Sequence, residues 1–267
     1  MKIVVLKFGG TSVGSIDRIK KVVNIIISYL KKNTKVIVVS SAMSGATNKL
    51  IKQSKLISET FDSSEYDVLL SAGEQIACAL IAGRLNHLGI KSKSFMNWQV
   101  PIISDTEHKN AKILKIPQNN IKKYLKTGGV PIVAGFQGIS YMNRTTTLGR
   151  GASDYSAIMI AKHFNASKCI IYTDVRGVMT TDPKVYEKAK RINKISYEEM
   201  LEMSSLGSKV MQSNSVQDAR LNRINVLVKS SFLGGEGTLI TKKKNIKNSK
   251  VIRGISFTKS DAKITLV

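Results

Sequence analysis

An apolar run, a pair of glycines and a long periodic segment stand in that order at the start of the chain. Residues 3–6 are all apolar and predict a buried strand, and apolar residues recur at helical spacing from Ile16 to Leu30. Between them lies the turn Lys7-Phe8-Gly9-Gly10-Thr11-Ser12-Val13. Such a turn exposes backbone N–H groups and the positive end of a helix, so it predicts an anion site to which Lys7 adds charge. Because the lysine precedes the glycines, the turn is not a G-x-x-x-x-G-K phosphate loop. A plain turn with a solvated lysine is the alternative.

Strand-like and helix-like segments alternate along most of the chain. This alternation predicts an α/β protein in three layers, with a mostly parallel central sheet and helices on both faces. The length of 267 residues fits one large domain, or one domain and a fragment. The further apolar runs are Val36–Val39, Ile132–Ala134, Cys169–Tyr172 and Val226–Val228, the helical patterns are Val68–Leu88 and Tyr155–Phe164, and the polar stretches Ser58–Glu65 and His108–Lys123 are predicted to be loops or excursions.

The formal net charge of +24 is the strongest signal in the composition. It fits either a nucleic-acid-binding protein, whose lysines neutralise phosphates, or an enzyme with a lysine-rich surface and anionic ligands. The lysines are dispersed and lack interleaved aromatic residues, and Lys242-Lys243-Lys244 is their one run. This distribution favours the enzyme, and no nucleic-acid partner is expected.

Cysteine, histidine and hydropathy patterns exclude other classes of protein. Cys78 and Cys169 are far apart among apolar neighbours, which favours two buried free thiols in a reducing, cytoplasmic setting. The three histidines are scattered, so no structural zinc site is expected. No uninterrupted apolar stretch is long enough for a membrane helix, and the start of the chain lacks the features of a secretory signal.

Two segments near the first turn carry further candidate binding groups. The small, hydroxyl-rich stretch Ser40–Asn48 follows a predicted strand, as a ligand-binding loop does at the carboxyl edge of a sheet. A capping turn with Thr47 or Asn48 at a helix start explains it equally well. Glu74 lies in an apolar helical pattern, where an unpaired carboxylate is expensive. It is either solvated or holds a cation such as a substrate ammonium group.

Two later segments combine glycines with charged residues. In residues 145–157, two glycines bracket Arg150, a residue suited to bidentate binding of a carboxylate or phosphate, and Ser153 and Asp154 then open a helix. Asp154 is alternatively a first-turn carboxylate favoured by the helix dipole. Residues 172–184 follow a buried strand and offer a ring, two carboxylates, hydroxyls and a proline turn, which suit the base and ribose of a nucleotide. Lys209 is a further candidate phosphate contact.

These segments together resemble the amino-acid kinase superfamily, and within it the aspartokinases. The resemblance covers about residues 1–240. Ala152 stands where a third glycine is usual, Arg176 where many members have an acidic residue, and Met179 replaces a common tyrosine. The motifs occur in the order of the family: K-F-G-G-T-S-V, S-A-M-S-G-x-T-N, S-A-G-E-Q, G-F-Q-G (Gly135 to Gly138), T-L-G-R-G-x-S-D, Y-T-D-V-x-G-V and G-S-K-V.

The resemblance implies an enzyme that uses ATP to phosphorylate the β-carboxylate of L-aspartate, giving 4-phospho-L-aspartate at the start of the lysine, threonine and methionine (diaminopimelate) pathway. It implies ATP and Mg²⁺, with the metal held mainly by phosphate oxygens, and a cytoplasmic homodimer without a membrane partner. The implied catalytic residues are Lys7 and Asp154, and the implied aspartate-binding residues are Ser41, Thr47, Glu74 and Arg150. The implied nucleotide-binding residues are Lys7, Gly9, Gly10, Thr173, Asp174, Met179, Thr180, Thr181, Asp182, Pro183, Lys184 and Lys209.

The same resemblance divides the chain at residue 245. Residues 1–245 are expected to form the catalytic domain, and residues 246–267 the opening of a truncated ACT-like regulatory segment, with possible strands at Ser249–Ser256 and Ala262–Val267. Two strands cannot bury a face alone, so they are expected to dock on the main body or on a partner chain. A sibling kinase acting on glutamate or N-acetylglutamate, a basic nucleic-acid-binding protein and a catalytically weakened interaction subunit are the alternatives.

Overall fold

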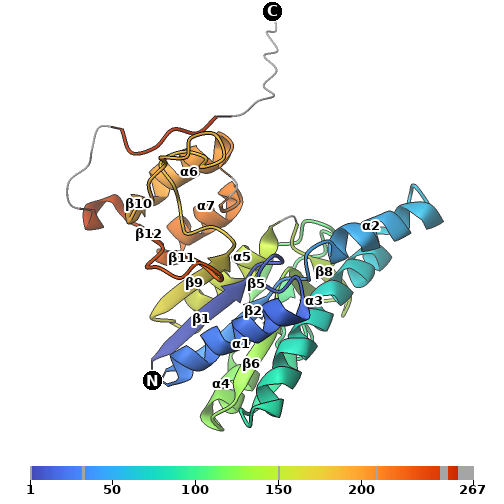
Figure 1. Ribbon diagram of the computed structural model, residues 1–267. Coiled ribbons are helices and arrows are strands. Elements are labelled where there is room, and N and C mark those ends of the chain that lie inside the picture. Colours follow the sequence, from blue (N-terminus) through green and yellow to red (C-terminus); the bar gives the residue numbers. More distant parts are fainter. Residues whose placement is uncertain (1, 32–33, 150, 209, 247–251, 258–267) are drawn as a thin grey trace, which may run out of the picture.

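The structure is a computed structural model that describes residues 2–31, 34–149, 151–208, 210–246 and 252–257. Its centre is an eight-stranded sheet in the order β10-β12-β11-β9-β1-β2-β6-β3 (Figure 1). All neighbouring pairs are parallel except β11 and β12. The strands are β1 (Ile3–Phe8), β2 (Lys35–Ser40), β3 (Ser92–Phe95), β6 (Val130–Ala134), β9 (Lys168–Thr173), β10 (Lys194–Ser196), β11 (Val226–Ser230) and β12 (Thr238–Thr241).

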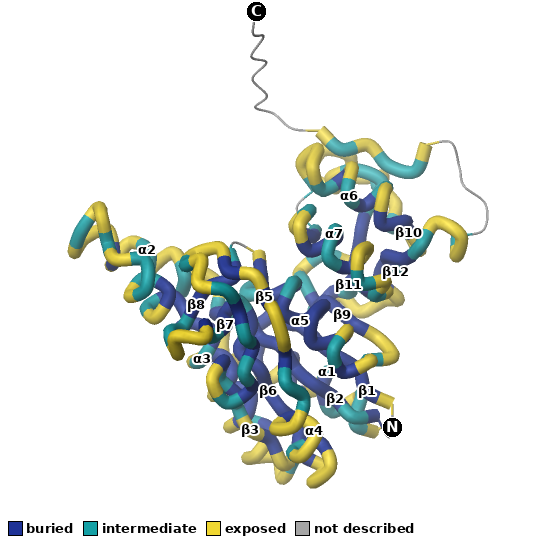
Figure 2. The backbone as a smooth tube through the Cα atoms, turned by 180° about the vertical axis from the view of Figure 1, so that it is seen from behind, coloured by how far each residue is buried: buried dark blue, intermediate teal, exposed yellow. Residues whose placement is uncertain are grey.

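Helices cover both faces of this sheet. Side chains on β1 alternate, so Val4, Leu6 and Phe8 pack on one side with α1 and α3, while Ile3 and Val5 pack on the other with α4, α5 and α7. The buried positions follow the central strands and α5 (Figure 2). The predicted three-layer α/β fold is thereby confirmed. The helices are α1 (Ile16–Leu30), α2 (Ala46–Ile57), α3 (Ser63–His87), α4 (Asn119–Lys126), α5 (Ala152–His163), α6 (Tyr197–Ser205), α7 (Ser213–Leu221) and the 3-10 turn η1 (Lys243–Asn245).

A second, four-stranded sheet has the order β5-β4-β7-β8. It is formed by β4 (Ile103–Ser104), β5 (Ile113–Lys115), β7 (Gln137–Ser140) and β8 (Thr145–Thr147). The stretch His108–Lys123 was expected to be a loop or an excursion from the main sheet, and β5, which belongs to the second sheet, and the first part of α4 lie within it. The loop expectation was wrong for α4, which is short and polar and buries only Ile121 and Leu125, so few apolar residues mark it in the sequence.

The long helix α3 begins earlier than its apolar pattern. Asp62 accepts hydrogen bonds from the backbone N–H groups of Ser64 and Glu65, and this cap starts the helix inside the predicted loop Ser58–Glu65. Among the described residues, α3 is the one helix that is long and apolar enough to cross a bilayer, and half of its most apolar window is buried inside the protein. Burial against the sheet accounts for that composition.

The end of the chain differs from its prediction where it is described. Residues 252–256 lie along α6 without forming a strand, so the strand predicted over Ser249–Ser256 is wrong for that part. They are held by one backbone hydrogen bond, from Ile255 N–H to Thr180 O (2.7 Å), and by Arg253. Arg253 pairs with Glu199 (3.2 Å) and donates to the carbonyl oxygen of Lys194 (3.1 Å). The predicted strand Ala262–Val267 lies outside the described residues.

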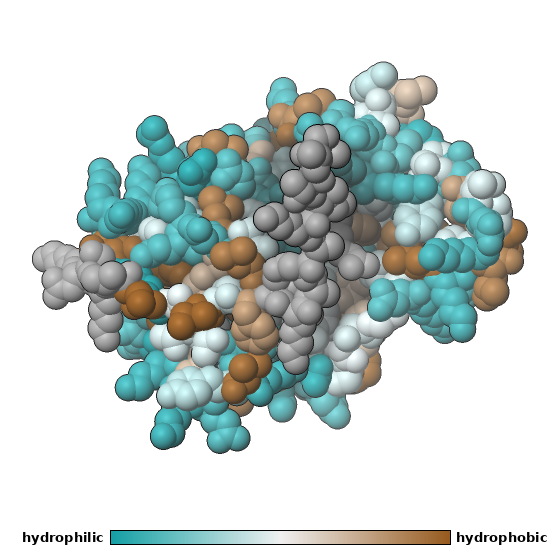
Figure 3. Space-filling model, turned by 90° about the horizontal axis from the view of Figure 1, so that it is seen from above, coloured by the Kyte–Doolittle hydropathy of each residue, from teal (hydrophilic) through white to brown (hydrophobic). Residues whose placement is uncertain are grey.

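The charged side chains are spread over the surface. The face shown in Figure 3 is mainly hydrophilic among its described residues, with hydrophobic residues scattered between them. The lysine run at 242–244 lies at and around η1, and Lys243 and Lys244 are exposed.

The sheet topology brings the segments that carry the sequence motifs to one edge of the main sheet. Because β1, β2, β6, β9 and β11 are parallel, their carboxyl ends meet at one edge, where ligands bind in open α/β sheets.

Candidate active site

Lys7 lies at the middle of that edge, on the central strand β1. It shares the side of the sheet that Ile3 and Val5 occupy, and there its Nζ meets Asp154 Oδ1 at 2.5 Å. Both side chains are 10% exposed. Asp154 is in the first turn of α5, where a carboxylate also suits the positive end of the helix. Buried charges persist when they are paired, so the pair holds the lysine ammonium group at a fixed point of the site.

Glu74 supplies a second buried carboxylate near Lys7. It is 4% exposed, and its Oε1 accepts a hydrogen bond from the backbone N–H of Ala42 (3.0 Å). Its Oε2 is buried and has no hydrogen-bond partner among the described residues. Burial raises the pKa of Glu74 from 4.5 to about 7, against the opposing effect of the Ala42 N–H group and of the Lys7 charge. An unsatisfied carboxylate oxygen of this kind has room for one more donor.

Close backbone contacts bring the predicted loops together. A Cβ on Gly10 would lie 2.9 Å from the carbonyl oxygen of Ala42, and a Cβ on Gly73 would lie 2.8 Å from Ala42 Cβ. Two hydrogen bonds fasten the same loops, from Ser41 N–H to Phe8 O and from Ser44 N–H to Gly10 O, both at 3.1 Å. The glycines therefore allow the turn after β1, the loop after β2 and helix α3 to meet at one point.

Two predicted substrate residues, Ser41 and Thr47, lie in or beside that loop and are half-buried. Thr47 is in the first turn of α2, which has Gly45 at its N-cap with φ +83° and without a side-chain capping bond. A helix does start at this turn, as the capping alternative expected, but Gly45 is the N-cap in place of Thr47 or Asn48, so capping does not occupy the Thr47 hydroxyl. Arg150 and Lys209, two further predicted cations, lie outside the described residues.

The opposite side of Lys7 belongs to β9. The N–H of Gly9 donates to the carbonyl oxygen of Tyr172 (3.1 Å), and Ser12 Oγ lies 2.9 Å from Ser231 Oγ. These contacts tie the glycine turn to the ends of β9 and β11. Thr173 ends β9 and its hydroxyl donates to Asp174 Oδ1 (3.1 Å). Ser12 and Ser231 were not selected from the sequence, although Ser12 lies inside the first motif.

The predicted nucleotide turn, residues 179–184, is a compact structure. Met179 forms an antiparallel bridge with Arg191, and the Thr180 N–H donates to Lys190 O (2.8 Å). Asp182 Oδ1 accepts from the N–H of Lys184 (2.9 Å), which closes the turn around Pro183. Thr181 is half-buried, whereas the side chains of residues 182–184 are exposed. The turn begins five residues after Asp174.

The edge therefore has two halves with Lys7 between them. The loop after β2, the first turn of α2 and helix α3 contribute Ser41, Thr47 and Glu74 on one side. The end of β9 and the residue after it contribute Thr173 and Asp174 on the other. The described residues contain no group of three or more His, Cys, Asp or Glu side chains that would hold a metal. The donors near Lys7 are backbone N–H groups and an ammonium group, which suit a polyphosphate that brings its own cation.

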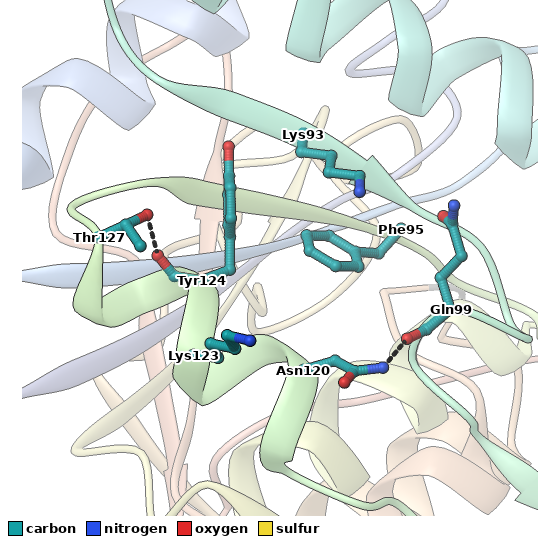
Figure 4. A pocket seen from close by; sticks show the side chains of 7 residues that line it. All are labelled: Lys93, Phe95, Gln99, Asn120, Lys123, Tyr124 and Thr127. Atoms are coloured by element: carbon teal, nitrogen blue, oxygen red, sulfur yellow. Dashed lines mark hydrogen bonds between the residues drawn. The ribbon is translucent and has the colours of Figure 1, made fainter.

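A cavity of about 450 Å³ lies elsewhere, between β3 and α4 (Figure 4). The rings of Phe95 and Tyr124 meet edge to face with centroids 5.4 Å apart, and Asn120 Nδ2 donates to Gln99 O (2.6 Å). None of the sequence motifs contributes to this cavity, and its described lining contains no carboxylate. The edge around Lys7 is therefore the candidate active site. The cavity is lined by Lys93, Phe95, Gln99, Asn120, Lys123, Tyr124 and Thr127.

Comparison with known proteins identifies the family to which the chain belongs. The amino acid kinase family profile matches residues 2–230. An aspartate kinase of Stutzerimonas stutzeri is 45% identical over 267 residues, and an aspartokinase of Rickettsia felis is 45% identical over 271 residues. Each match covers 100% of this chain, which spans 65% and 67% of those relatives.

Solved structures agree with the sequence relatives. Escherichia coli aspartokinase III, solved with aspartate and ADP, superposes with a TM-score of 0.83 at 28% identity, over 95% of this chain and 67% of that one. A uridylate kinase of Archaeoglobus fulgidus, at 18% identity and a TM-score of 0.64, shares the fold over 90% of this chain and 100% of its own. The chain therefore belongs to the amino acid kinase family and, within it, to the aspartokinases.

Proposed function

We propose that this chain transfers the γ-phosphoryl group of ATP to the β-carboxylate of L-aspartate, giving 4-phospho-L-aspartate. The observation that carries the proposal is the buried Oε2 of Glu74, which has no hydrogen-bond partner among the described residues and lies in the same site as the buried ammonium group of Lys7. A substrate with a free α-ammonium group supplies that donor. The relatives described above, an aspartate kinase, an aspartokinase and an aspartokinase solved with aspartate and ADP, support this substrate.

The acceptor needs no general base. A carboxylate with a pKa of about 4 is already ionised near neutral pH. The protein must instead hold two anions in line and offset their repulsion, which is work for positive charge and backbone donors. Lys7 lies on the strand between the two halves of the site, so its ammonium group faces the phosphoryl group in transit. Asp154 keeps that ammonium group in place and abstracts no proton.

The remaining residues bind the two substrates. Glu74 holds the aspartate ammonium group, Ser41 and Thr47 contribute hydroxyls, and Arg150 holds a carboxylate. Gly9 and Gly10 face the phosphates. Mg²⁺, when bound, neutralises phosphate charge and is held mainly by the phosphate oxygens. The other nucleotide contacts are Thr173, Asp174, Met179, Thr180, Thr181, Asp182, Pro183, Lys184 and Lys209.

We further propose that the enzyme is a cytoplasmic homodimer with residues 1–245 as its catalytic domain and an ACT-like segment beginning at residue 246. The surface of α3 is the proposed dimer contact. Two copies of a chain with a net charge of +24 repel each other, and this repulsion is weakest where a surface lacks lysine and arginine, as α3 does between Ser63 and Gly83. Its exposed Val68, Ile76 and Leu80 form an uncharged row along the helix. Sedimentation equilibrium should give twice the chain mass, and Ile76→Glu should give the single mass.

A hydroxamate assay tests the proposed reaction. The chain is incubated with ATP, Mg²⁺ and either aspartate, glutamate or N-acetylglutamate, and hydroxylamine traps the acyl phosphate. Only aspartate should give product. Lys7→Met should remove the signal, whereas Lys20→Met, which changes an exposed lysine on α1, should keep it. Equal turnover of glutamate would contradict the assignment, and turnover of N-acetylglutamate would contradict the role of Glu74, because that substrate has no ammonium group.

A further inference from the structure

A third buried carboxylate, Asp67, lies outside the proposed catalytic and binding roles. It is 0% exposed and stands on α3 two turns before Glu74, about 10 Å along the same side of the helix. Asp67 Oδ1 accepts from the Thr147 hydroxyl (2.6 Å), Oδ2 accepts from His108 Nδ1 (2.7 Å), and the Lys109 N–H lies 3.1 and 3.2 Å from the two oxygens. A buried carboxylate is retained only when such donors surround it.

The donors come from two segments that are distant in sequence and touch each other. The Ala111 N–H donates to the carbonyl oxygen of Thr147 (2.9 Å). A Cβ on Gly149 would lie 2.8 Å from Asn110 Oδ1, so the end of β8 packs closely on this loop. Asp67 is therefore the point at which α3, the loop 105–112 and β8 are joined.

Both sides of the proposed aspartate site are connected to this junction. Helix α3 carries Glu74, and β8 ends at Thr147, five residues before α5 begins. The N–H of Ala152 donates to Gly149 O (3.2 Å), and Asp154 follows in the first turn of α5. A shift of β8 away from α3 would thus change the separation between Glu74 and the Lys7–Asp154 pair.

We propose that Asp67 and His108 are positioning residues that fix the aspartate-binding half of the site through Thr147. The inference rests on the proposed function, since it concerns the affinity for that substrate. Neither residue touches the substrate. The nucleotide half lies beyond Lys7, on β9 and the segments after it, whereas the hydrogen-bond partners of Asp67 among the described residues are His108, Lys109 and Thr147.

His108 gives the cleanest test, because its side chain is 22% exposed and its removal leaves Asp67 with its other donors. His108→Ala should raise the KM for aspartate about tenfold, the usual effect of losing one hydrogen bond to a charged group, with the KM for ATP within about twofold. His108→Asn places an amide N–H close to the position of Nδ1 and should return the KM for aspartate to within about threefold. His87→Ala, which removes an exposed histidine in the last turn of α3, is the matched control and should leave both constants unchanged.

Amide hydrogen exchange measures how stable the junction around Asp67 is, independently of activity. The amides of Lys109 and Ala111 should exchange at least about tenfold faster in His108→Ala and in Thr147→Val, and at the wild-type rate in His108→Asn. Unchanged exchange, or faster exchange with an unchanged KM for aspartate, would overturn the inference. An equal rise of both KM values together with a lower Tm would also overturn it, because that result describes general destabilisation. If the variants change the exchange rates as expected but the wild-type chain phosphorylates no aspartate, the proposed function is refuted and the junction is not.

Discussion

Glu74 should affect stability and substrate binding in opposite directions. Burial raises its pKa from 4.5 to about 7, so the folded state binds the proton more tightly than the unfolded state does. The free energy of unfolding therefore falls as pH rises between these two values and is level above and below them. At about 1.4 kcal/mol per pH unit, the interval from 4.5 to about 7 corresponds to a loss of about 3 kcal/mol at alkaline pH.

Glu74→Gln removes this loss and keeps the acceptor for the Ala42 N–H group. At about pH 8, the variant should be more stable than the wild type by up to about 3 kcal/mol, and near pH 4 the two should be alike. The same change should raise the KM for aspartate by about a hundredfold, because the substrate ammonium group loses a buried counter-charge, and leave ATP binding nearly intact. In the wild type, kcat/KM for aspartate should rise with pH up to about 7 and then level off.

Urea denaturation at several pH values measures the first effect, and calorimetric titration with aspartate and with a non-hydrolysable ATP analogue measures the second. Glu59→Gln, at an exposed position, is the control and should change neither. A Glu74→Gln protein less stable than the wild type at about pH 8 would refute the reasoning. A stability difference independent of pH would refute it as well, since it would assign the effect to packing rather than to ionisation.

Three further predictions concern the same region of the protein. Lys7→Met should lower kcat at least about a hundredfold and change the KM for aspartate less than about threefold; an unchanged kcat in steady-state kinetics would contradict this. Lys7→Met leaves the buried Asp154 carboxylate unpaired, so Asp154→Asn added to it should restore stability without restoring turnover. Gly73→Ala should cost about 1–3 kcal/mol in urea denaturation because its Cβ would meet Ala42, whereas Gly83→Ala on the same helix has open space and should be neutral or stabilising; equal effects would contradict the packing argument. Cys78 and Cys169 are fully buried, which raises the pKa of both thiols, that of Cys169 to about 12, so an aromatic disulfide reagent should react with neither in the folded protein and with both in urea.

The fold was largely predictable because its central strands are buried on both faces. Such strands appear in the sequence as uninterrupted apolar runs, and Val36–Val39 and Cys169–Tyr172 lie within β2 and β9. The edge of the sheet is harder to detect. The short helix α4 buries two apolar residues, and the described residues 252–256 are held by Arg253 and by the Ile255 N–H group rather than by an apolar pattern.

Site residues were predictable where their chemistry conflicts with their surroundings. Glu74 stands out as a carboxylate in an apolar helix, and Lys7 as a cation between a buried strand and two glycines. Asp67 and His108 gave no such signal. His108 lies in a polar stretch, and its partner is 41 residues away, so only the folded chain brings the two together. Their pairing depends on how β8 packs on α3, which local patterns do not encode.

Two buried carboxylates near Lys7 have been given different properties by their surroundings. Asp154 is paired with the lysine ammonium group at the positive end of α5, and this pairing keeps both charges in place. Glu74 has one backbone donor and one oxygen without a partner among the described residues, and burial raises its pKa to about 7. The first carboxylate therefore stabilises the site before any ligand arrives. The second destabilises the ligand-free protein at alkaline pH and becomes favourable when an ammonium group binds. Under the proposed function, the affinity for aspartate therefore derives in part from relieving that cost.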